Sequence, residues 1–498
     1  MKRLSRKEFM GWMGAGAAAM ALPARVRGAR PEGRRPNFIL IMADDLSANE
    51  LSCYGNKENR TPLLDELART GVMFRTCWAT PVCGPSRAAI MTGRYGYRTG
   101  WYHNDMKPAA GDKGYNLAQD NLIFSQVLKK AGYVTGVCGK WQLRGTEKEY
   151  GFDETCMHHA IKGEFEGPVE PEEGSLPGRV ARYWHPAIVA NGKQVKTTEN
   201  DYGDDVYADF ILDFAKRHKD EPFLFYFPMS LIHITWDFDN NRMGYVAPPE
   251  LDNNGNKTGR KGQPTKKGNV EYMDHIVGRL AKGLETLGLR DNTAILFTGD
   301  NGTAGYGKGQ LAEERGPRVP MIVNCPGFVK PLGPCDAIVS FADVLPTLAE
   351  MGGGELPKDY EIDGRSFAPV LRGEKKQTRE WIFSNYADKR WLRDTRWLLD
   401  GNGRFFDCGD RRDETGYKDG ADSKDPEAVA ARRRFEEILK GMPAPAPDDP
   451  TVKRYEEKNK AQKERRAKSH QLWQEKYGGD GPKQKKGKGG KKPKAEAG

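Results

Sequence analysis

Cys83 opens a short run, Cys83-Gly84-Pro85-Ser86-Arg87, that combines a nucleophile, a helix start and a cation. Proline is well tolerated in the first turn of a helix, so we expect Cys83 at a helix N-terminus. The free backbone N–H groups and the positive end of the helix dipole make such a position an anion site. Arg87, one turn further on, can direct its guanidinium fork back to the same place.

Two further polar pairs each follow an apolar run. Asp44-Asp45 follows residues 37–43, and Asp300-Asn301 follows residues 293–298. Ligands bind at the carboxyl ends of parallel strands, where both pairs are expected. Three carboxylates and an amide oxygen form a hard oxygen site suited to Ca²⁺. Taken alone, an Asp pair could equally cap a helix or solvate a loop.

The segment from Cys83 to Arg94, CGPSRAAIMTGR, resembles the signature of the formylglycine-dependent sulfatases of the alkaline-phosphatase-like superfamily. The resemblance extends over about residues 36–410. It implies that a maturation enzyme converts Cys83 to formylglycine, whose hydrate attacks sulfur with one hydroxyl and expels sulfate with the other. A buried cysteine before a helix is the alternative interpretation of the local motif.

The same resemblance implies the rest of the site. The implied ligands of one divalent cation, Ca²⁺, are Asp44, Asp45, Asp300, Asn301 and the modified Cys83. The implied catalytic residues are Cys83, Arg87, Lys140, His233 and Lys308. The implied substrate contacts are Lys140, Gln142, His233 and Lys308, with His233 able to protonate the leaving oxygen. Without the resemblance, a single lysine or histidine would be interpreted as a surface or structural residue.

Gln142 departs from the family pattern. The family commonly places a histidine two residues after the first lysine, and here Lys140 is followed by Trp141 and Gln142. An amide can hydrogen-bond the diol or sulfate, but it cannot take a proton. The sequence therefore does not identify the base that deprotonates the diol when sulfate is expelled. His103 is one candidate, with a surface histidine as the alternative interpretation.

The elements that position these residues indicate an α/β fold. Apolar runs predict strands over residues 37–43, 133–138, 223–227, 293–298 and 319–324. Helical patterns alternate with them, beginning at Thr61-Pro62 and covering residues 121–131, 207–218 and 271–287. This alternation predicts a mostly parallel central sheet sandwiched by helices.

The pattern changes near residue 375. Short strand-like runs follow over residues 381–386, 390–394, 397–400 and 404–408, and a helix is predicted near 427–439. Gly401-Asn402-Gly403 is typical of a hairpin turn. The expected domains are an export signal and linker (1–35), a catalytic domain (36–374), a small antiparallel subdomain (375–442), and a linker, charged helix and basic disordered tail (443–498).

Charge is concentrated at the two ends of the chain. The whole chain carries +10, of which residues 1–35 contribute +7 and residues 451–498 contribute +10, leaving −7 for the body. The pI of about 9.0 is therefore no argument for a nucleic-acid partner. The basic tail is a candidate binder of polyanions or of the cell envelope, with plain solvation as the alternative.

The first residues resemble an export signal. Lys2, Arg3, Arg6 and Lys7 precede an apolar run over residues 9–22, in the order typical of a twin-arginine-like or general secretory signal. The run is short for a bilayer core of about 30 Å, which disfavours a membrane anchor. We expect export to the periplasm or beyond. The eight cysteines match no zinc or disulfide framework, and their pairing stays open.

Together these features predict an enzyme that hydrolyses sulfate monoesters, with sulfated carbohydrates as the expected substrate class. A phosphomonoesterase or phosphodiesterase on the same fold is one alternative, but such sites typically use Ser or Thr nucleophiles and two metals. A non-catalytic, secreted, polyanion-binding protein is the other. Cys83 and the two lysines argue against the first alternative, and the complete nucleophile and metal motifs argue against the second.

Overall fold

The computed structural model describes residues 35–108, 115–158, 182–237 and 242–458, with 460, 461 and 464. The predicted export signal, His159 and the basic tail beyond residue 464 lie outside the described residues. The chain divides into two compact units, Met1–Pro445 and Ala446–Gly498. In the second unit, residues 450–458 form a helix.

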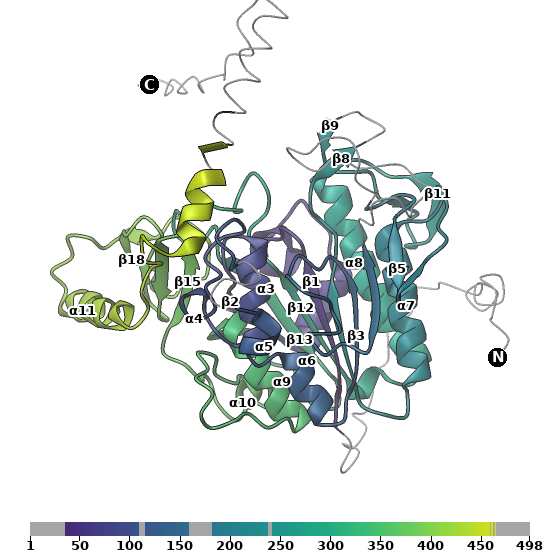
Figure 1. The fold of residues 1–498 in the computed structure, drawn as a ribbon, viewed down its shortest axis with the longest axis horizontal. Helices are drawn as coiled ribbons and strands as arrows, with labels where there is room; N and C mark the ends of the chain where they lie inside the picture. Colours follow the sequence, from purple (N-terminus) through teal and green to yellow (C-terminus); the bar gives the residue numbers. More distant parts are fainter. Residues whose placement is uncertain are drawn as a thin grey trace, which may run out of the picture. The chain divides into compact units, whose positions relative to one another are not determined.

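A large sheet forms the centre of the first unit (Figure 1). In spatial order, its ten described strands are β14 (Gly333–Ser340), β2 (Val72–Trp78), β13 (Arg318–Asn324), β12 (Thr293–Gly299), β1 (Asn37–Ala43), β7 (Phe223–Pro228), β3 (Val134–Gly139), β4 (Glu154–His158), β5 (Ile188–Ala190) and β6 (Lys193–Gln194). The neighbours β12, β1, β7, β3 and β4 are parallel, whereas β13 is antiparallel to both of its neighbours. The predicted mostly parallel α/β sheet is confirmed.

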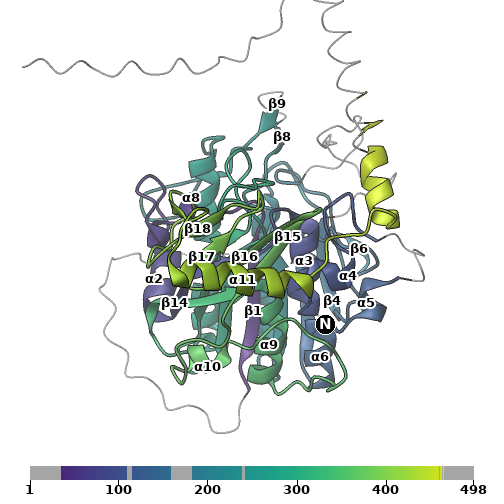
Figure 2. The same cartoon turned by 90° about the vertical axis from the view of Figure 1, so that its left-hand side faces the viewer.

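Helices cover both faces of this sheet, as Figure 2 shows. One face packs against α3 (Cys83–Thr92), α6 (Phe124–Lys130) and α9 (Val344–Gly352). The other face packs against α2 (Pro62–Thr70), α7 (Gly203–Arg217) and α8 (Lys266–Thr286). Strand β1 is buried throughout because Phe38, Leu40 and Met42 enter the first core while Ile39 and Ile41 enter the second.

Smaller elements join these layers. The short helices are α4 (Gly96–Thr99), α5 (Leu117–Asp120) and α10 (Ala368–Leu371), with 3-10 turns at Ala48–Glu50, Ser52–Tyr54, Arg290–Asn292 and Phe341–Asp343. Two antiparallel ribbons pair β8 (Thr235–Asp237) with β9 (Arg242–Gly244) and β10 (Pro249–Leu251) with β11 (Lys257–Lys261).

A second sheet follows the central one in the chain, as predicted. Its strands are β15 (Ile382–Tyr386), β16 (Lys389–Arg393), β17 (Trp397–Leu399), β18 (Phe405–Asp407) and β19 (Lys418–Asp419). All neighbouring pairs are antiparallel, and α11 (Pro426–Lys440) packs on the sheet through Phe435. The predicted turn at Gly401-Asn402-Gly403 joins β17 to β18, with Gly403 at a φ of 74°.

This small sheet supports the loop that follows β12. Trp391 on β16 donates from Nε1 to the carbonyl of Glu313 at 2.9 Å, and the N–H of Glu313 donates to Asp400 at 3.0 Å. Arg393 and Glu314 form an ion pair whose two side chains are both fully buried. The loop between β12 and β13 is therefore held by the small sheet on one side and by the central sheet at both ends.

The described residues can be examined for disulfide bonds and for a membrane-spanning helix, two features linked to export. All eight cysteines are free thiols, so the described residues hold no disulfide. No helix in the described part of the chain is long and apolar enough to cross a bilayer.

Candidate active site

The ends of β1 and β12 bring the two acidic pairs together. The strands are parallel neighbours, and Ala43 at the end of one lies opposite Gly299 at the end of the other. Asp44 and Asp300 therefore leave the sheet side by side. The backbone N–H of Asp45 then donates to Oδ1 of Asp300 at 2.9 Å, which ties the two strand ends to each other.

Asp45 and Asn301 form the second layer of this cluster. Asp45 has a φ of 61°, in the left-handed region that aspartate visits more readily than most residues. Its Oδ1 accepts a hydrogen bond from Nδ2 of Asn301 at 2.7 Å. Oδ1 of Asn301 is buried and has no hydrogen-bond partner among the described residues. A buried oxygen left this way needs an ion or a water to satisfy it.

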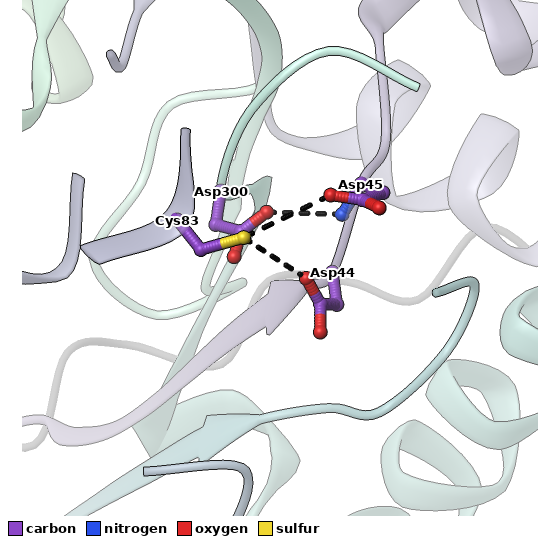
Figure 3. Close-up of side chains that lie close together, drawn as sticks. All are labelled: Asp44, Asp45, Cys83 and Asp300. Atoms are coloured by element: carbon purple, nitrogen blue, oxygen red, sulfur yellow. Dashed lines mark hydrogen bonds between the residues drawn. The ribbon is translucent and has the colours of Figure 1, made fainter. Parts of the chain in front are cut away.

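Cys83 points into the same cluster (Figure 3). It is the first residue of α3 and is 1% exposed. Its thiol lies 3.5 Å from Oδ1 of Asp44 and 3.8 Å from Oδ1 of Asp45. Burial and the charge of Asp300 raise the pKa of the Cys83 thiol. As the first residue of α3, Cys83 stands at the positive end of the helix dipole.

Two side chains fix the start of α3. The hydroxyl of Ser86 accepts a hydrogen bond from the N–H of Thr80 at 2.9 Å and lies 2.8 Å from the Thr80 hydroxyl. On the other side, Oδ1 of Asn104 accepts a hydrogen bond from the N–H of Gly84 at 2.8 Å. The serine of the motif therefore closes the turn before Cys83, and Asn104 satisfies one of the donors at the helix start.

Arg87 connects three parts of the site. Its guanidinium donates to Oδ2 of Asp300 at 2.8 Å and to the carbonyl of Lys140 at 2.7 Å. The Arg87 and Asp300 side chains are both fully buried. Burial is the largest single influence and acts to lower the pKa of Arg87, but the charge of Asp300 and those of other neighbouring groups together raise it. Arg87 therefore stays charged and holds α3, β12 and the end of β3 together.

Two lysines reach the cluster from different loops. Lys140 follows β3 and donates to Oδ2 of Asp44 at 2.5 Å, with its Nζ 3.9 Å from Sγ of Cys83. Lys308 lies in the loop after β12 and donates to Oδ2 of Asp45 at 2.9 Å. Burial acts to raise the pKa of Asp44, but the charges of Lys140 and its cationic neighbours keep it well below its usual value.

His233 lies beside Lys308. Its Nε2 is 3.3 Å from Nζ of Lys308 and 3.7 Å from Oδ2 of Asp45, and its Nδ1 is 3.4 Å from Nη1 of Arg182. Burial lowers the pKa of His233 to about 3, and Lys308 acts in the same direction. The imidazole is therefore neutral. Arg182 and Lys308 can only donate, so the neutral ring can accept a hydrogen bond from one of them at a time, and Nε2 is the ring nitrogen that faces Lys308 and Asp45.

The donor set fits a divalent cation that prefers oxygen. One atom each from Asp44, Asp45, Cys83 and Asp300 lies within 4.8 Å of the others, and the unpartnered oxygen of Asn301 adds a neutral donor. Burial and the charge of Asp44 raise the pKa of Asp300, so the carboxylates repel each other in the absence of a cation. Asp and Asn oxygens are ligands that Ca²⁺ accepts in proteins.

The comparison with known families decides what this cluster belongs to. The family model named Sulfatase matches residues 36–354, well over half of the chain. The chain belongs to the sulfatase family. The matched region contains every residue of the cluster described above.

Named relatives cover most of the chain. The sulfatase is 30% identical over 474 residues to the steryl-sulfatase of Mus musculus, covering 77% of this chain and 72% of the relative. It is also 30% identical over 423 residues to human arylsulfatase A, covering 74% of each chain. An N-acetylglucosamine-6-O-sulfatase of Bacteroides thetaiotaomicron is 26% identical over 458 residues.

Solved structures agree with the fold. The crystal structure of Ps i-CgsB in complex with k-i-k-neocarrahexaose superposes with a TM-score of 0.64 at 25% identity, covering 81% of this chain and 93% of that chain. Family and relatives together identify the protein as a sulfuric ester hydrolase. The phosphoesterase and the non-catalytic polyanion binder are therefore the less supported alternatives.

Gln142, the departure from the family pattern, also has unusual backbone geometry. Its φ is 61°, and its Oε1 is buried without a hydrogen-bond partner among the described residues. A non-glycine residue in this region carries strain that the surrounding structure must hold. The sulfatase therefore keeps a strained backbone and an unsatisfied acceptor two residues beyond Lys140.

His103, the candidate base, packs against the small sheet. Its Nε2 lies 3.1 Å from the hydroxyl of Tyr386 on β15, and the two rings meet edge to face at 4.9 Å. Its neighbour Asn104 is the residue that contacts Gly84 at the start of α3. His103 is thus the sequence neighbour of Asn104, which contacts the helix that begins at Cys83.

Two residues of the site carry no sequence signal that predicts them. Asn104 and Arg182 contact Gly84 and the ring of His233, respectively. Both stand in segments without regular periodicity, where a single polar residue is usually solvated. For Asn104, the only hint is that the polar run His103-Asn104-Asp105 stands between buried residues, which indicates that this part of the chain turns inward.

Proposed function

We propose that this sulfatase hydrolyses sulfate monoesters of carbohydrates, using formylglycine made from Cys83 and one divalent cation, Ca²⁺. The observation that carries the proposal is the convergence of Cys83 with Asp44, Asp45 and Asp300 within 4.8 Å at the start of a helix. The names of two similar proteins support the substrate class: one is an N-acetylglucosamine-6-O-sulfatase, and the other is solved in complex with k-i-k-neocarrahexaose.

A divalent cation and the formylglycine made from Cys83 would complete the chemistry. Asp44, Asp45, Asp300, Asn301 and the modified Cys83 would hold the cation, which would supply a positive charge against the sulfate oxygens. Formylglycine would supply, as its hydrate, a hydroxyl nucleophile and a second hydroxyl that allows turnover. The thiol of Cys83 in this structure marks the position of that group.

The residues of the chain bind and orient the ester around Cys83. Lys140 and Lys308 offer two ammonium groups to the sulfate oxygens, since each lies at the boundary between the cluster and solvent. Arg87 is buried in its pair with Asp300, so it positions the helix start and the end of β3. His233 presents Nε2 toward the same place and, as an imidazolium, can donate a proton to the leaving oxygen. A bound anionic ester would raise the proton affinity of that ring.

The domain limits and the export of the protein are part of the same proposal. Residues 36–374 would form the catalytic domain and 375–442 the small subdomain, which supports the loop that carries Lys308. Residues 1–35 would direct export, and 443–498 would form the linker, charged helix and basic tail. A sulfatase of extracellular carbohydrate requires such export.

The test is a comparison of esters on protein produced with a maturation enzyme. Mass spectrometry of the peptide containing residue 83 is expected to show formylglycine, and 4-nitrophenyl sulfate is expected to be hydrolysed much faster than 4-nitrophenyl phosphate. A panel of monosaccharide sulfates then identifies the sugar and the position. An unmodified thiol together with faster phosphate hydrolysis would contradict the proposal.

A further inference from the structure

The segment that follows β7 contacts both the carboxylate cluster and the histidine. The N–H of Asp44 donates to the carbonyl of Leu231 at 2.7 Å, and the N–H of Ile232 donates to the carbonyl of Asp44 at 2.9 Å. His233 is the next residue, and its N–H donates to the carbonyl of Ser230 at 3.1 Å. The backbone of residues 230–232 therefore sets the position of His233 relative to Asp44.

The side chain of Asp204 holds this segment. It is the second residue of α7, and it is fully buried. The N–H of Ser230 donates to its Oδ1 at 3.2 Å, and the N–H of Leu231 contributes a further hydrogen bond. The carboxylate thus accepts hydrogen bonds from the two consecutive residues whose carbonyls bond His233 and Asp44.

Tyr183 and Arg182 make further contacts with His233. The hydroxyl of Tyr183 lies 2.7 Å from the carbonyl of Ser230 and 2.8 Å from the carbonyl of His233. Arg182, which contacts Nδ1 of His233, is close enough to Asp204 for its charge to lower the pKa of that carboxyl. The backbone and the ring of His233 therefore both depend on groups gathered around Asp204.

We propose that Asp204 is a positioning residue for His233, holding Ser230 and Leu231 so that Nε2 faces the leaving oxygen of the ester. The inference rests on the proposed function, because it requires His233 to assist departure of that oxygen. As the bond between sulfur and the leaving oxygen breaks, its electron pair stays on the oxygen, and the imidazolium formed when the anionic ester binds passes its Nε2 proton to that oxygen and becomes neutral imidazole. Asp204 does not contact the ester itself.

The neighbouring Asp205 provides a matched control. It is also buried on the first turn of α7. Its carboxylate accepts hydrogen bonds from Lys257, from the hydroxyl of Tyr272 at 2.8 Å and from Arg279 at 3.3 Å. These partners belong to β11 and α8, so Asp205 anchors α7 without contacting the segment after β7.

Asparagine is the conservative replacement for Asp204. Burial raises the pKa of Asp204 to about 7, against the hydrogen bond from Ser230. Asparagine keeps Oδ1 as an acceptor for the two N–H groups, whereas alanine removes it.

The experiment compares two aryl sulfates of similar shape in the matured enzyme. The leaving group of 4-nitrophenyl sulfate is an acidic phenol that departs without a proton, whereas 4-methylphenyl sulfate releases a phenol with a pKa of about 10, as for tyrosine. For Asp204→Ala we expect kcat on the methylphenyl ester to fall by about 10–100-fold, the cost of misplacing a catalytic group by an ångström. The fall on the nitrophenyl ester should be several times smaller.

The other variants separate positioning from folding. Asp204→Asn is expected to restore the wild-type ratio of the two kcat values, and Asp205→Asn is expected to leave that ratio unchanged even if Tm falls. Should Asp204→Ala not fold, Asp204→Ser takes its place, since its shorter side chain also removes the Oδ1 acceptor.

Two outcomes would overturn the inference in different ways. An active wild type, with equal losses on both esters in Asp204→Ala or Asp204→Ser, would show that Asp204 only stabilises the fold and would overturn this inference alone. A matured wild type that hydrolyses neither sulfate would overturn the proposed function, and the role of Asp204 with it.

Discussion

The active site has two halves that differ in burial. The acidic half consists of Asp44, Asp45, Asp300 and Asn301 with Cys83, and each side chain is at most 1% exposed. The basic half consists of Lys140, His233 and Lys308, whose side chains are 13%, 22% and 27% exposed. The difference fits the proposed roles, in which the buried half holds the cation and the nucleophile and the more exposed half meets the substrate.

The two halves are also built differently. The acidic half is fixed by the register of β1 and β12 and by backbone hydrogen bonds such as that from Asp45 to Asp300. The basic half depends on loops, each of which is anchored elsewhere: the loop of Lys308 by the small sheet and the segment of His233 by α7. Rigid strand ends suit a cation and a nucleophile, whereas loops allow relatives to vary the substrate.

The largest effect is expected at Cys83, where the two halves meet. Cys83→Ala should reduce sulfate hydrolysis by at least about 10³-fold, because the proposed formylglycine nucleophile has no other source. Cys83→Ser should do the same in a host whose maturation enzyme accepts only cysteine. Turnover on 4-nitrophenyl sulfate and the mass of the residue-83 peptide measure this. Wild-type turnover by the alanine variant would remove the basis for the whole site.

Asp300 should show a mixed effect on activity and stability. Asp300→Asn removes a carboxylate of the proposed cation site and also leaves the buried Arg87 without its charge partner. Breaking a buried ion pair from one side costs about 3–5 kcal/mol. We therefore expect both turnover and Tm to fall, with loss of bound Ca²⁺ by elemental analysis.

Asp44→Ala sharpens the same test. Its partner Lys140 is 13% exposed and can be solvated, so turnover and bound Ca²⁺ should fall while Tm falls less than in Asp300→Asn. Chelation should slow the wild type unless the ion is trapped. Full Ca²⁺ binding by both variants would show that the acidic half does not hold the cation.

A smaller effect is expected at Gln142 on the substrate side. Gln142→Ala should slow turnover by the equivalent of about 1.5–3 kcal/mol, the value of a lost hydrogen bond to a charged group. The formylglycine should remain, because maturation depends on the segment around Cys83 and Arg87. Full activity on the natural substrate would show that the side chain does not contact the sulfate or the diol.

The acidic half is the part of the site that local sequence best predicts. Asp44-Asp45 and Asp300-Asn301 directly follow apolar runs that can only be buried strands, and strand ends meet at one edge of a parallel sheet. Cys83 was predicted at a helix start from Pro85, and it is the first residue of α3. In each case the signal and the residue lie within one turn or one strand.

The basic half could be predicted only through the family resemblance. Lys308 and His233 are 75 positions apart in the chain, yet their side chains meet at 3.3 Å. Nothing near either residue specifies that contact, because it depends on loops supported by distant elements. Asn104, Arg182 and Asp204 were not predicted at all for the same reason: their partners come from other segments, and no alternation or cap marks them.

The fold shows the same limit. Strand β1 was predicted from an uninterrupted apolar run, but β2 contains Arg75 and β14 begins with Gly333-Pro334, which weaken the strand signal. Both were missed, although they pair with each other along six positions. The helix predicted over residues 121–131 begins at Phe124, because Asn121 ends α5 and the next two residues are not helical.

The smallest effect is expected from truncation after Pro445. Every residue of both halves lies in the unit Met1–Pro445, and so do the central sheet and the small sheet. Hydrolysis of 4-nitrophenyl sulfate should therefore stay within about twofold of the full chain, and Tm within a few degrees, as for changes far from a core.

Residues 451–498 carry +10, so a role of this tail in binding would concern polyanions. In that case the truncated enzyme should lose affinity for a sulfated polysaccharide at low salt, and the difference should vanish at high salt because exposed charges are screened. Equal affinity at low salt would show that the tail is only solvated, whereas loss of folding on truncation would show that it stabilises the catalytic unit.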